Sequence, residues 1–288
     1  MSREPGQQPK TVRLSAAALG LLGVAGLFVA GLTALRGADE SEAALSAPSP
    51  SPFRAVVHVP GISTDGTPDP TWTPTPVPTA TPTPKRPASP QGLRVYSNGD
   101  STSYFMTVAL YSLMQNLGSV PVAEAEYKIS SGLVRTDFFD WYAYLATQMA
   151  AYQPDVVVFM VGANDALQTG GLDAYRQRVA AMMDQLRAPA RLVVWVGQPI
   201  MDSARSASLA AAIPGLNQVF REEAAARPWV LYVDAYALTA DANGNYADYL
   251  PDETGTLRLM RAGDGIHFTP EGGRRLALGV IAALFPPN

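Results

Sequence analysis

Residues 155–161 read DVVVFMV and residues 191–197 read RLVVWVG, so two runs of the chain are apolar at almost every position. Such runs, unlike runs of alternating polarity, are typical of strands buried on both faces of a parallel sheet. A short strand is expected at 93–97, and further strands are expected at 122–129 and 229–235. Helical patterns separate the five strands. Repeated strand–helix units predict a parallel sheet with helices on both faces.

The segments between the strands predict five helices, at 102–117, 137–152, 172–187, 206–226 and from Pro270 to near Phe285. Thr136 is expected to cap the second helix, because a threonine side chain can accept a hydrogen bond from a free N–H of the first turn. Pro214 lies inside the fourth helix and is expected to break or kink it. Pro270 suits the first position of the last helix.

Residues 14–35 form a run of 22 residues without a charge, which is long enough to span a bilayer as a helix. Arg3, Lys10 and Arg13 precede it, so residues 1–13 are expected to be cytoplasmic and the rest extracytoplasmic. The alternative is a long signal peptide that is cleaved, which would release a secreted protein. Both interpretations predict export, and the first predicts a single-pass membrane anchor.

Residues 36–92 are predicted to be a disordered stalk rich in Pro and Thr. The part from 48 to 90 contains 13 prolines among 43 residues. A segment of this composition cannot bury enough apolar surface to offset the conformational entropy that it would lose on folding. In polyproline geometry, at about 3.1 Å per residue, it would reach roughly 130 Å. The alternative is a linker with no spacing role. Residues 93–288 are predicted to form the globular domain.

Composition excludes several classes of function. The net charge of −4 gives no electrostatic reason to expect nucleic-acid binding. The absence of cysteine excludes disulfides, thiolate metal sites and a cysteine nucleophile. The chain has only two histidines, and His58 lies in the predicted stalk, so His267 is the one histidine of the domain. We expect no metal and no cofactor.

Polar residues that can carry chemistry follow the predicted strands. Asn98-Gly99-Asp100-Ser101 follows the first strand, Gly162-Ala163-Asn164-Asp165 follows the third, and Asp264-Gly265-Ile266-His267 precedes the last helix. Ligands of open parallel sheets bind at these carboxyl ends. A serine there needs a base to act as a nucleophile, and His267 is the one candidate. Asp264 can orient the imidazole, and Asn164 can donate to an oxyanion. Asp100 and Asp165 are expected to make structural hydrogen bonds rather than to bind metal.

In this order the blocks resemble those of the SGNH (GDSL-like) hydrolase superfamily, over residues 93–285. The matching residues are Gly99-Asp100-Ser101, Gly132, the block 162–165 and the block 264–267. The sequence at 130–141 and 264–273 is similar to a bacterial subgroup attached to exported or membrane-anchored chains. One departure is Thr102, where the family has leucine.

The resemblance implies a flavodoxin-like three-layer α/β/α sandwich with a five-stranded parallel sheet. It also implies that Ser101 is the nucleophile and that His267 is the base, oriented by Asp264. The oxyanion hole would then consist of the backbone amides of Ser101 and Gly132 with the side chain of Asn164.

These expectations favour a serine esterase that hydrolyses O-acyl esters, particularly O-acetyl esters of cell-envelope glycans, through an acyl-serine intermediate. Its partners would be an acylated small-molecule or glycan substrate and the membrane. An O-acyltransferase with the same residues and a non-catalytic glycan-binding module are the alternatives. Arg135 is expected either to bind a substrate carboxylate or to form a surface salt bridge. The polar segment 236–262, with Tyr236, Tyr246 and Tyr249, is expected to be a lid, a binding loop or a self-packed loop.

Overall fold

The computed structural model describes residues 85–286. The predicted cytoplasmic N-terminus, the predicted anchor at 14–35, residues 36–84 of the predicted stalk and His58 therefore lie outside the described residues. Within 85–286, no helix is both long and apolar enough to cross a bilayer. Residues 85–92, at the end of the predicted stalk, lie against the domain: Arg86 donates a hydrogen bond to the Ala283 carbonyl, and Pro90 accepts one from the Ser119 hydroxyl.

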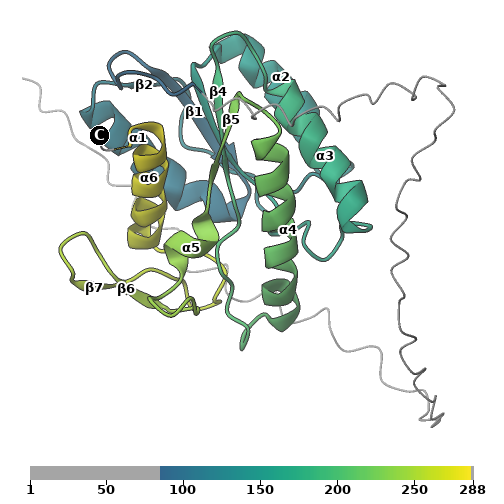
Figure 1. Cartoon of the computed structure of the whole chain (residues 1–288), viewed down its shortest axis with the longest axis vertical. Coiled ribbons are helices and arrows are strands. Elements are labelled where there is room, and N and C mark those ends of the chain that lie inside the picture. The colour runs from purple at the N-terminus through teal and green to yellow at the C-terminus, as the bar shows by residue number, and fades with distance from the viewer. Residues whose placement is uncertain (1–84, 287–288) are drawn as a thin grey trace, which may run out of the picture. The chain divides into compact units, whose positions relative to one another are not determined.

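The five predicted strands form one parallel sheet in the order β2-β1-β3-β4-β5 (Figure 1). This is the flavodoxin-like order, in which the chain direction across the sheet reverses between β1 and β3. The strands are β1 Arg94–Gly99, β2 Val120–Pro121, β3 Val156–Met160, β4 Leu192–Val196 and β5 Val230–Val233.

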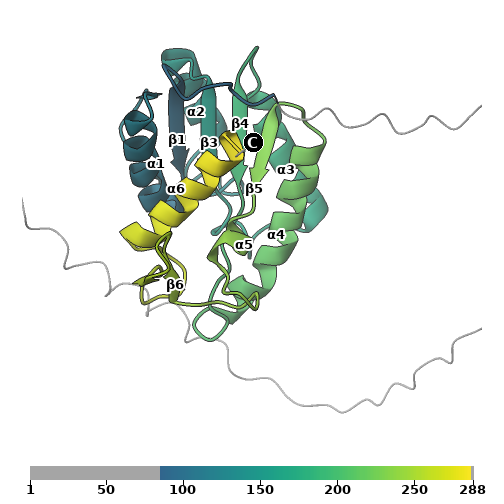
Figure 2. The ribbon, with the colours of Figure 1, turned by 60° about the vertical axis from the view of Figure 1, so that its left-hand side comes forward.

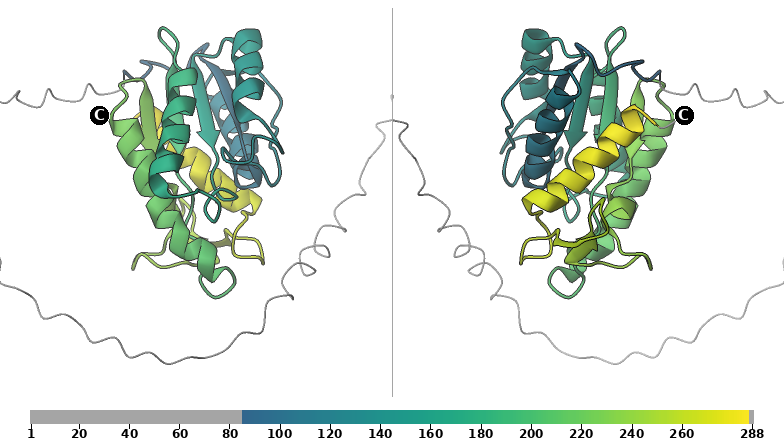
Figure 3. Two further views of the ribbon diagram at one scale, coloured as in Figure 1. Left: turned by 90° about the vertical axis from the view of Figure 1, so that its right-hand side faces the viewer. Right: turned by 90° about the vertical axis from the view of Figure 1, so that its left-hand side faces the viewer.

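Helices cover both faces of this sheet, as the sequence predicts, and make the three layers visible in Figures 2 and 3. A 3₁₀ turn, η1, covers Ser101–Ser103, and the helices are α1 Tyr104–Asn116, α2 Trp141–Tyr152, α3 Leu172–Gln185, α4 Ala207–Ala225, α5 Ala235–Thr239 and α6 Pro270–Leu284. Helices α1 and α6 lie on one face, and α2, α3 and α4 lie on the other.

The alternation of side chains along β3 explains why its sequence is apolar throughout. Val156 and Val158 pack in the cluster that contains α1 and α6, whereas Val157 and Phe159 pack in the cluster that contains α2, α3 and α4. Each face of the strand thus meets helices rather than water, and no position can be polar without burying an unpaired group.

Three sequence predictions differ from the structure. The second strand, Val120–Pro121, lies before the predicted range 122–129 and is much shorter, because only these two residues pair continuously with β1 before the chain leaves the sheet. Helix α2 begins at Trp141, capped by Asp140, whose carboxylate accepts from the N–H groups of Tyr142 and Ala143; Thr136 is not its cap.

The sequence predicted a break or a kink at Pro214, and the break is wrong, because helix α4 continues through this residue. The proline removes one hydrogen bond to the preceding turn. Pro214 is exposed, however, so water can donate a hydrogen bond to the carbonyl that has lost its N–H partner. The helix therefore tolerates this loss.

Close packing of α1 against α6 predicts the effect of a single methyl group. A Cβ atom added at Gly273 in α6 would lie 2.4 Å from the backbone carbonyl carbon of Phe105 in α1. We expect Gly273→Ala to lower the free energy of unfolding by about 1–3 kcal/mol, because the helices must separate to admit the methyl group. Urea unfolding followed by tryptophan fluorescence measures the change.

Gly263→Ala is the matched control, because a Cβ atom at this loop position would meet nothing within 4 Å. It should leave the free energy of unfolding within about 0.5 kcal/mol of the wild-type value. Equal stability of the two variants would show that α1 and α6 do not need the glycine.

Candidate active site

Ser101, His267 and Asp264 form a continuous hydrogen-bonded chain. Ser101 lies in η1, directly after β1, and its Oγ is 2.8 Å from Nε2 of His267. Nδ1 of the same imidazole is 2.6 Å from Oδ2 of Asp264. The structure therefore brings together a hydroxyl, a base and an orienting carboxylate from segments that lie 166 residues apart. In this order the three groups can activate a serine for nucleophilic attack.

The loop that precedes α6 holds the imidazole in place. Asp264 uses its second oxygen, Oδ1, to accept hydrogen bonds from the backbone N–H groups of Ile266 and His267, both at 2.9 Å. Thr269 then caps α6 by accepting from the Gly272 N–H. The aspartate thus fixes both the backbone and the ring of the histidine.

Arg261 is a buried residue next to this loop that the sequence analysis missed. Its side chain is 1% exposed, and it donates to the carbonyls of Ile200 and Ile266 at 2.7 and 2.8 Å. Its guanidinium also lies 4.6 Å from the ring centre of Phe268. Burial lowers its pKa. Because Ile266 precedes His267 directly, Arg261 supports the backbone of the histidine loop. No motif in the sequence indicates this contact.

Asp100 joins the two strand ends on which the site is built. The residue is fully buried, and one carboxylate oxygen accepts from the N–H and the hydroxyl of Thr102. The other oxygen accepts from the N–H groups of Gly162 and Ala163, directly after β3. Burial raises its pKa, and these hydrogen bonds oppose that rise. Thr102, the departure from the family pattern, is thereby a buried partner of Asp100.

Asp165 shapes the neighbouring loop in the same manner. Its carboxylate accepts from the N–H groups of Leu133 and Val134 at 2.8 and 3.0 Å, and from the Tyr175 hydroxyl at 2.9 Å. A Cβ atom on Gly132 would lie only 2.1 Å from this carboxylate, so the close approach requires glycine. Burial raises the pKa of Asp165 as well.

Gly132 and Asn164 line one cavity of about 240 Å³. The Asn164 side chain donates one N–H to the Ser131 carbonyl at 2.9 Å and keeps a second N–H. The backbone N–H of Gly132 has no partner among the described residues. These two groups can therefore donate to an anionic oxygen. Ser101, the third predicted donor, is not one of the residues that line this cavity.

The charges of the site are coupled through the Asp264–His267 contact. The hydrogen bond that the imidazole donates to Asp264 raises the pKa of His267 above its ordinary value of 6.5, although burial opposes the rise. Burial acts to raise the pKa of Asp264, but the hydrogen bonds from the imidazole and the backbone outweigh it, so this carboxyl stays ionised over a wider pH range than usual. The aspartate is thus an anion whenever the histidine titrates.

The remaining predicted residues take structural positions. Arg135 forms a bidentate ion pair with Asp137, which supports the salt-bridge alternative, although it also borders the cavity of Gly132. The segment 236–262 forms α5 and an antiparallel hairpin of β6 Tyr249–Pro251 and β7 Leu257–Leu259. In the part of the chain that the structure describes, no three acidic or histidine side chains are placed to hold a metal ion.

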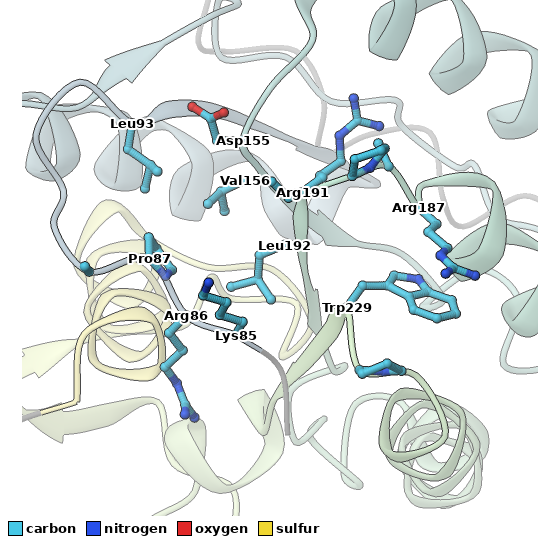
Figure 4. Close-up of a pocket in the computed structure, with 15 residues that line it drawn as sticks. Lys85, Arg86, Pro87, Leu93, Asp155, Val156, Arg187, Arg191, Leu192 and Trp229 are labelled. Carbon is cyan, nitrogen blue, oxygen red and sulfur yellow. The ribbon is translucent and has the colours of Figure 1, made fainter. Parts of the chain in front are cut away.

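A larger cavity, of about 880 Å³, lies at the opposite end of the sheet, where β3 and β4 begin. Figure 4 shows Leu93 and Leu192 on its wall, and Arg187 stacked on Trp229 with the guanidinium 4.4 Å from the ring centre. Lys85 also borders it. Parallel sheets bind their ligands at the carboxyl ends of the strands, so this cavity is not part of the candidate active site.

The strand order and the four motif blocks at one end of the sheet are those of the SGNH (GDSL-like) hydrolase superfamily, and the predicted resemblance is confirmed. Residues 94–283 match the family described as "Protein of unknown function (DUF459)". The chain belongs to this family, which is SGNH-hydrolase-like. A search of curated proteins finds no match.

Solved structures with similar folds include a lipase/acylhydrolase from Enterococcus faecalis, at 19% identity and a TM-score of 0.50, covering 66% of this chain and 93% of that one. An alpha/beta hydrolase enzyme from the metagenome of Lake Arreo, Spain, is 16% identical with a TM-score of 0.52, covering 67% and 95%. A variant of an acetyl xylan esterase from Geobacillus stearothermophilus is 15% identical with a TM-score of 0.52, covering 68% and 95%. At these identities the likeness establishes the fold.

The Asp264–His267 contact predicts the pH dependence of the site. An imidazole is a base only when neutral, so kcat/KM should rise as the pH passes upward through the pKa of His267, with a midpoint above 6.5. Asp264→Asn removes the anion that raises this pKa, so the midpoint should move to lower pH and kcat should fall about 10⁴-fold.

Proton NMR measures the same pKa without turnover, because only two histidines give imidazole signals and His58→Gln identifies the other one. An identical pKa of His267 in the wild type and in Asp264→Asn would contradict the orienting role of the aspartate.

The second N–H of Asn164 can stabilise a transition state by donating to its anionic oxygen, so removal of the side chain should weaken that stabilisation. Asn164→Ala should lower kcat on an ester substrate about 10²–10³-fold and change KM little, because the oxyanion develops only in the transition state. Steady-state kinetics on p-nitrophenyl acetate provide the measurement. Asn243→Ala, which removes an exposed amide in another loop, is the control and should retain wild-type kcat.

Proposed function

We propose that the protein is a serine esterase that hydrolyses O-acyl esters through an acyl-Ser101 intermediate. The observation that carries the proposal is the hydrogen-bonded chain from Ser101 Oγ through His267 to Asp264, at 2.8 and 2.6 Å. The similar structures include an acylhydrolase and an acetyl xylan esterase, which supports ester chemistry for this fold.

The residues account for each step of the reaction. Ser101 Oγ attacks the ester carbonyl carbon while Nε2 of His267 takes the hydroxyl proton, and ionised Asp264 stabilises the imidazolium. The Gly132 N–H and the Asn164 amide donate to the oxyanion. The imidazolium then protonates the leaving alcohol as the C–O bond breaks. A water molecule, deprotonated by the same imidazole, attacks the acyl-serine and releases the carboxylic acid and free Ser101.

The openness of the site favours hydrolysis over transfer to another alcohol. The side chains of His267 and Asp264 are 40% and 46% exposed, so water reaches the base directly. An acyltransferase must keep water from its acyl-enzyme, and the exposure of these two side chains within residues 85–286 supports hydrolysis instead. The cavity lined by Gly132 and Asn164 has a volume of about 240 Å³, which supports a short acyl group such as acetyl.

The place of action is part of the proposal. The predicted anchor at 14–35 and the Pro-rich stalk would hold the domain outside the cytoplasmic membrane, with residues 1–13 inside. Glycans of the cell envelope would then be the esters within reach. Cleavage of the anchor as a signal peptide would instead release the same esterase from the cell.

Covalent labelling tests the nucleophile. A fluorescent serine-reactive phosphonate should label the full-length wild-type protein, because His267 activates Ser101, and should leave Ser101→Ala unlabelled. Ser208→Ala, which removes an exposed hydroxyl on α4, is the matched control and should be labelled like the wild type. Absence of labelling in the wild type, or equal labelling of Ser101→Ala, would favour the non-catalytic glycan-binding module.

A further inference from the structure

A cavity of about 440 Å³ lies at the carboxyl end of β1, where Asn98 is one of the residues that line it. Tyr104, which follows η1 and begins α1, lies on its wall, so one wall starts three residues after Ser101. The segment 125–128 forms another wall, and it is tied to the nucleophile turn where the Lys128 N–H donates to the Gly99 carbonyl at 2.9 Å. Asn98 and Tyr104, which line the cavity, thus lie three residues before and three residues after Ser101 in the sequence.

Aromatic rings dominate the walls of this cavity. Tyr104 and Tyr127 pack together on one side, with ring centres 4.8 Å apart. Phe139 and Tyr144 pack together on the other, with ring centres 5.2 Å apart. Tyr127 is 43% exposed, so an aromatic surface faces solvent where no core packing requires it. An exposed ring beside a cavity suits contact with a ligand.

Two opposite charges accompany the rings. The ammonium of Lys128 lies 4.9 Å from the ring centre of Phe139, and the carboxylate of Glu126 accepts from the Tyr144 hydroxyl at 3.1 Å. The cation already occupies an aromatic face that a quaternary ammonium ligand would need. The neighbouring carboxylate opposes an anionic ligand. A long alkyl chain would bury both charges without partners.

We infer that this aromatic cavity binds a neutral sugar ring of the ester substrate. A sugar ring has apolar C–H faces that can lie against Tyr127 and Tyr104, and hydroxyls that can bond to Glu126 and Lys128. A cavity of this size, with aromatic walls and a few polar groups, has the usual composition of a small-molecule site. The inference rests on the proposed esterase function, because the sugar would be the alcohol that leaves Ser101.

A sugar ring bound in this cavity would also position the ester relative to Ser101 and His267. With the sugar ring against Tyr127, the ester oxygen would point to Ser101 and His267, and the acyl group toward the cavity of Gly132 and Asn164. Binding energy from the sugar would hold the ester carbonyl at the attacking hydroxyl, which raises kcat/KM for glycan esters over simple esters.

The test compares two acetyl esters on the full-length protein: O-acetylated xylo-oligosaccharides, which are neutral, and p-nitrophenyl acetate, which has no sugar. The quantity measured is selectivity, the ratio of kcat/KM on the first to kcat/KM on the second. Tyr127→Ala should lower this ratio about 10-fold, equivalent to ~1.4 kcal/mol of transition-state binding. Tyr127→Phe, which keeps the ring, should retain most of it.

Leu117→Ala is the matched control, because Leu117 is another apolar side chain, 40% exposed, that follows the last residue of α1 and is not among the residues that line the cavity. An unchanged ratio in Tyr127→Ala, or a larger loss in Leu117→Ala, would overturn the inference. A wild-type protein that cleaves p-nitrophenyl acetate but not the oligosaccharides would also overturn it while leaving the esterase function standing. Failure to cleave either ester would instead count against the proposed function.

Discussion

The buried carboxylate of Asp100 is the interaction on which the rest of the site depends. Its two oxygens accept hydrogen bonds from Thr102 on one side and from the N–H groups of Gly162 and Ala163 on the other. The turn that carries Ser101 and the turn that carries Asn164 are thereby linked between β1 and β3, where the chain direction across the sheet reverses. A buried carboxylate with four donors is costly to disturb, because losing one donor leaves an unpaired acceptor away from water. Neighbouring parts of the site can therefore keep fixed positions.

His267 is placed near Ser101 by the packing of α6 against α1 on one face of the sheet. Helix α6 lies against α1 closely enough that Gly273 contacts the backbone of Phe105, and His267 precedes α6 by three residues. The position of the imidazole is thus set by a helix contact, by the capping hydrogen bonds of Asp264 and by the buried guanidinium of Arg261. Each acts on the backbone of one loop, which explains how an exposed histidine keeps a defined geometry.

Much of the fold follows from the sequence, and the exceptions have local causes. The runs at 155–161 and 191–197 identify central strands because nothing polar can be placed on either face. Strand β2 was predicted too long and in the loop that follows it, because an edge strand has little periodicity to separate it from that loop. Pro214 was expected to break α4, but the exposed turn around it tolerates the lost hydrogen bond. The cap of α2 was placed four residues early, at Thr136 instead of Asp140, because both residues have side chains that can cap.

The sequence by itself determined the order of strands and helices and the identity of the residues that can act as nucleophile, base and orienting acid, because residue chemistry and the position of each block after a strand or before a helix are local properties. Only the tertiary structure decided the distances among Ser101, His267 and Asp264, the close approach of Asp165 to Gly132, and the aromatic cavity at the carboxyl end of β1. These features join segments up to 166 residues apart. No pattern within one segment encodes them, since they arise when the two helical layers pack on the sheet.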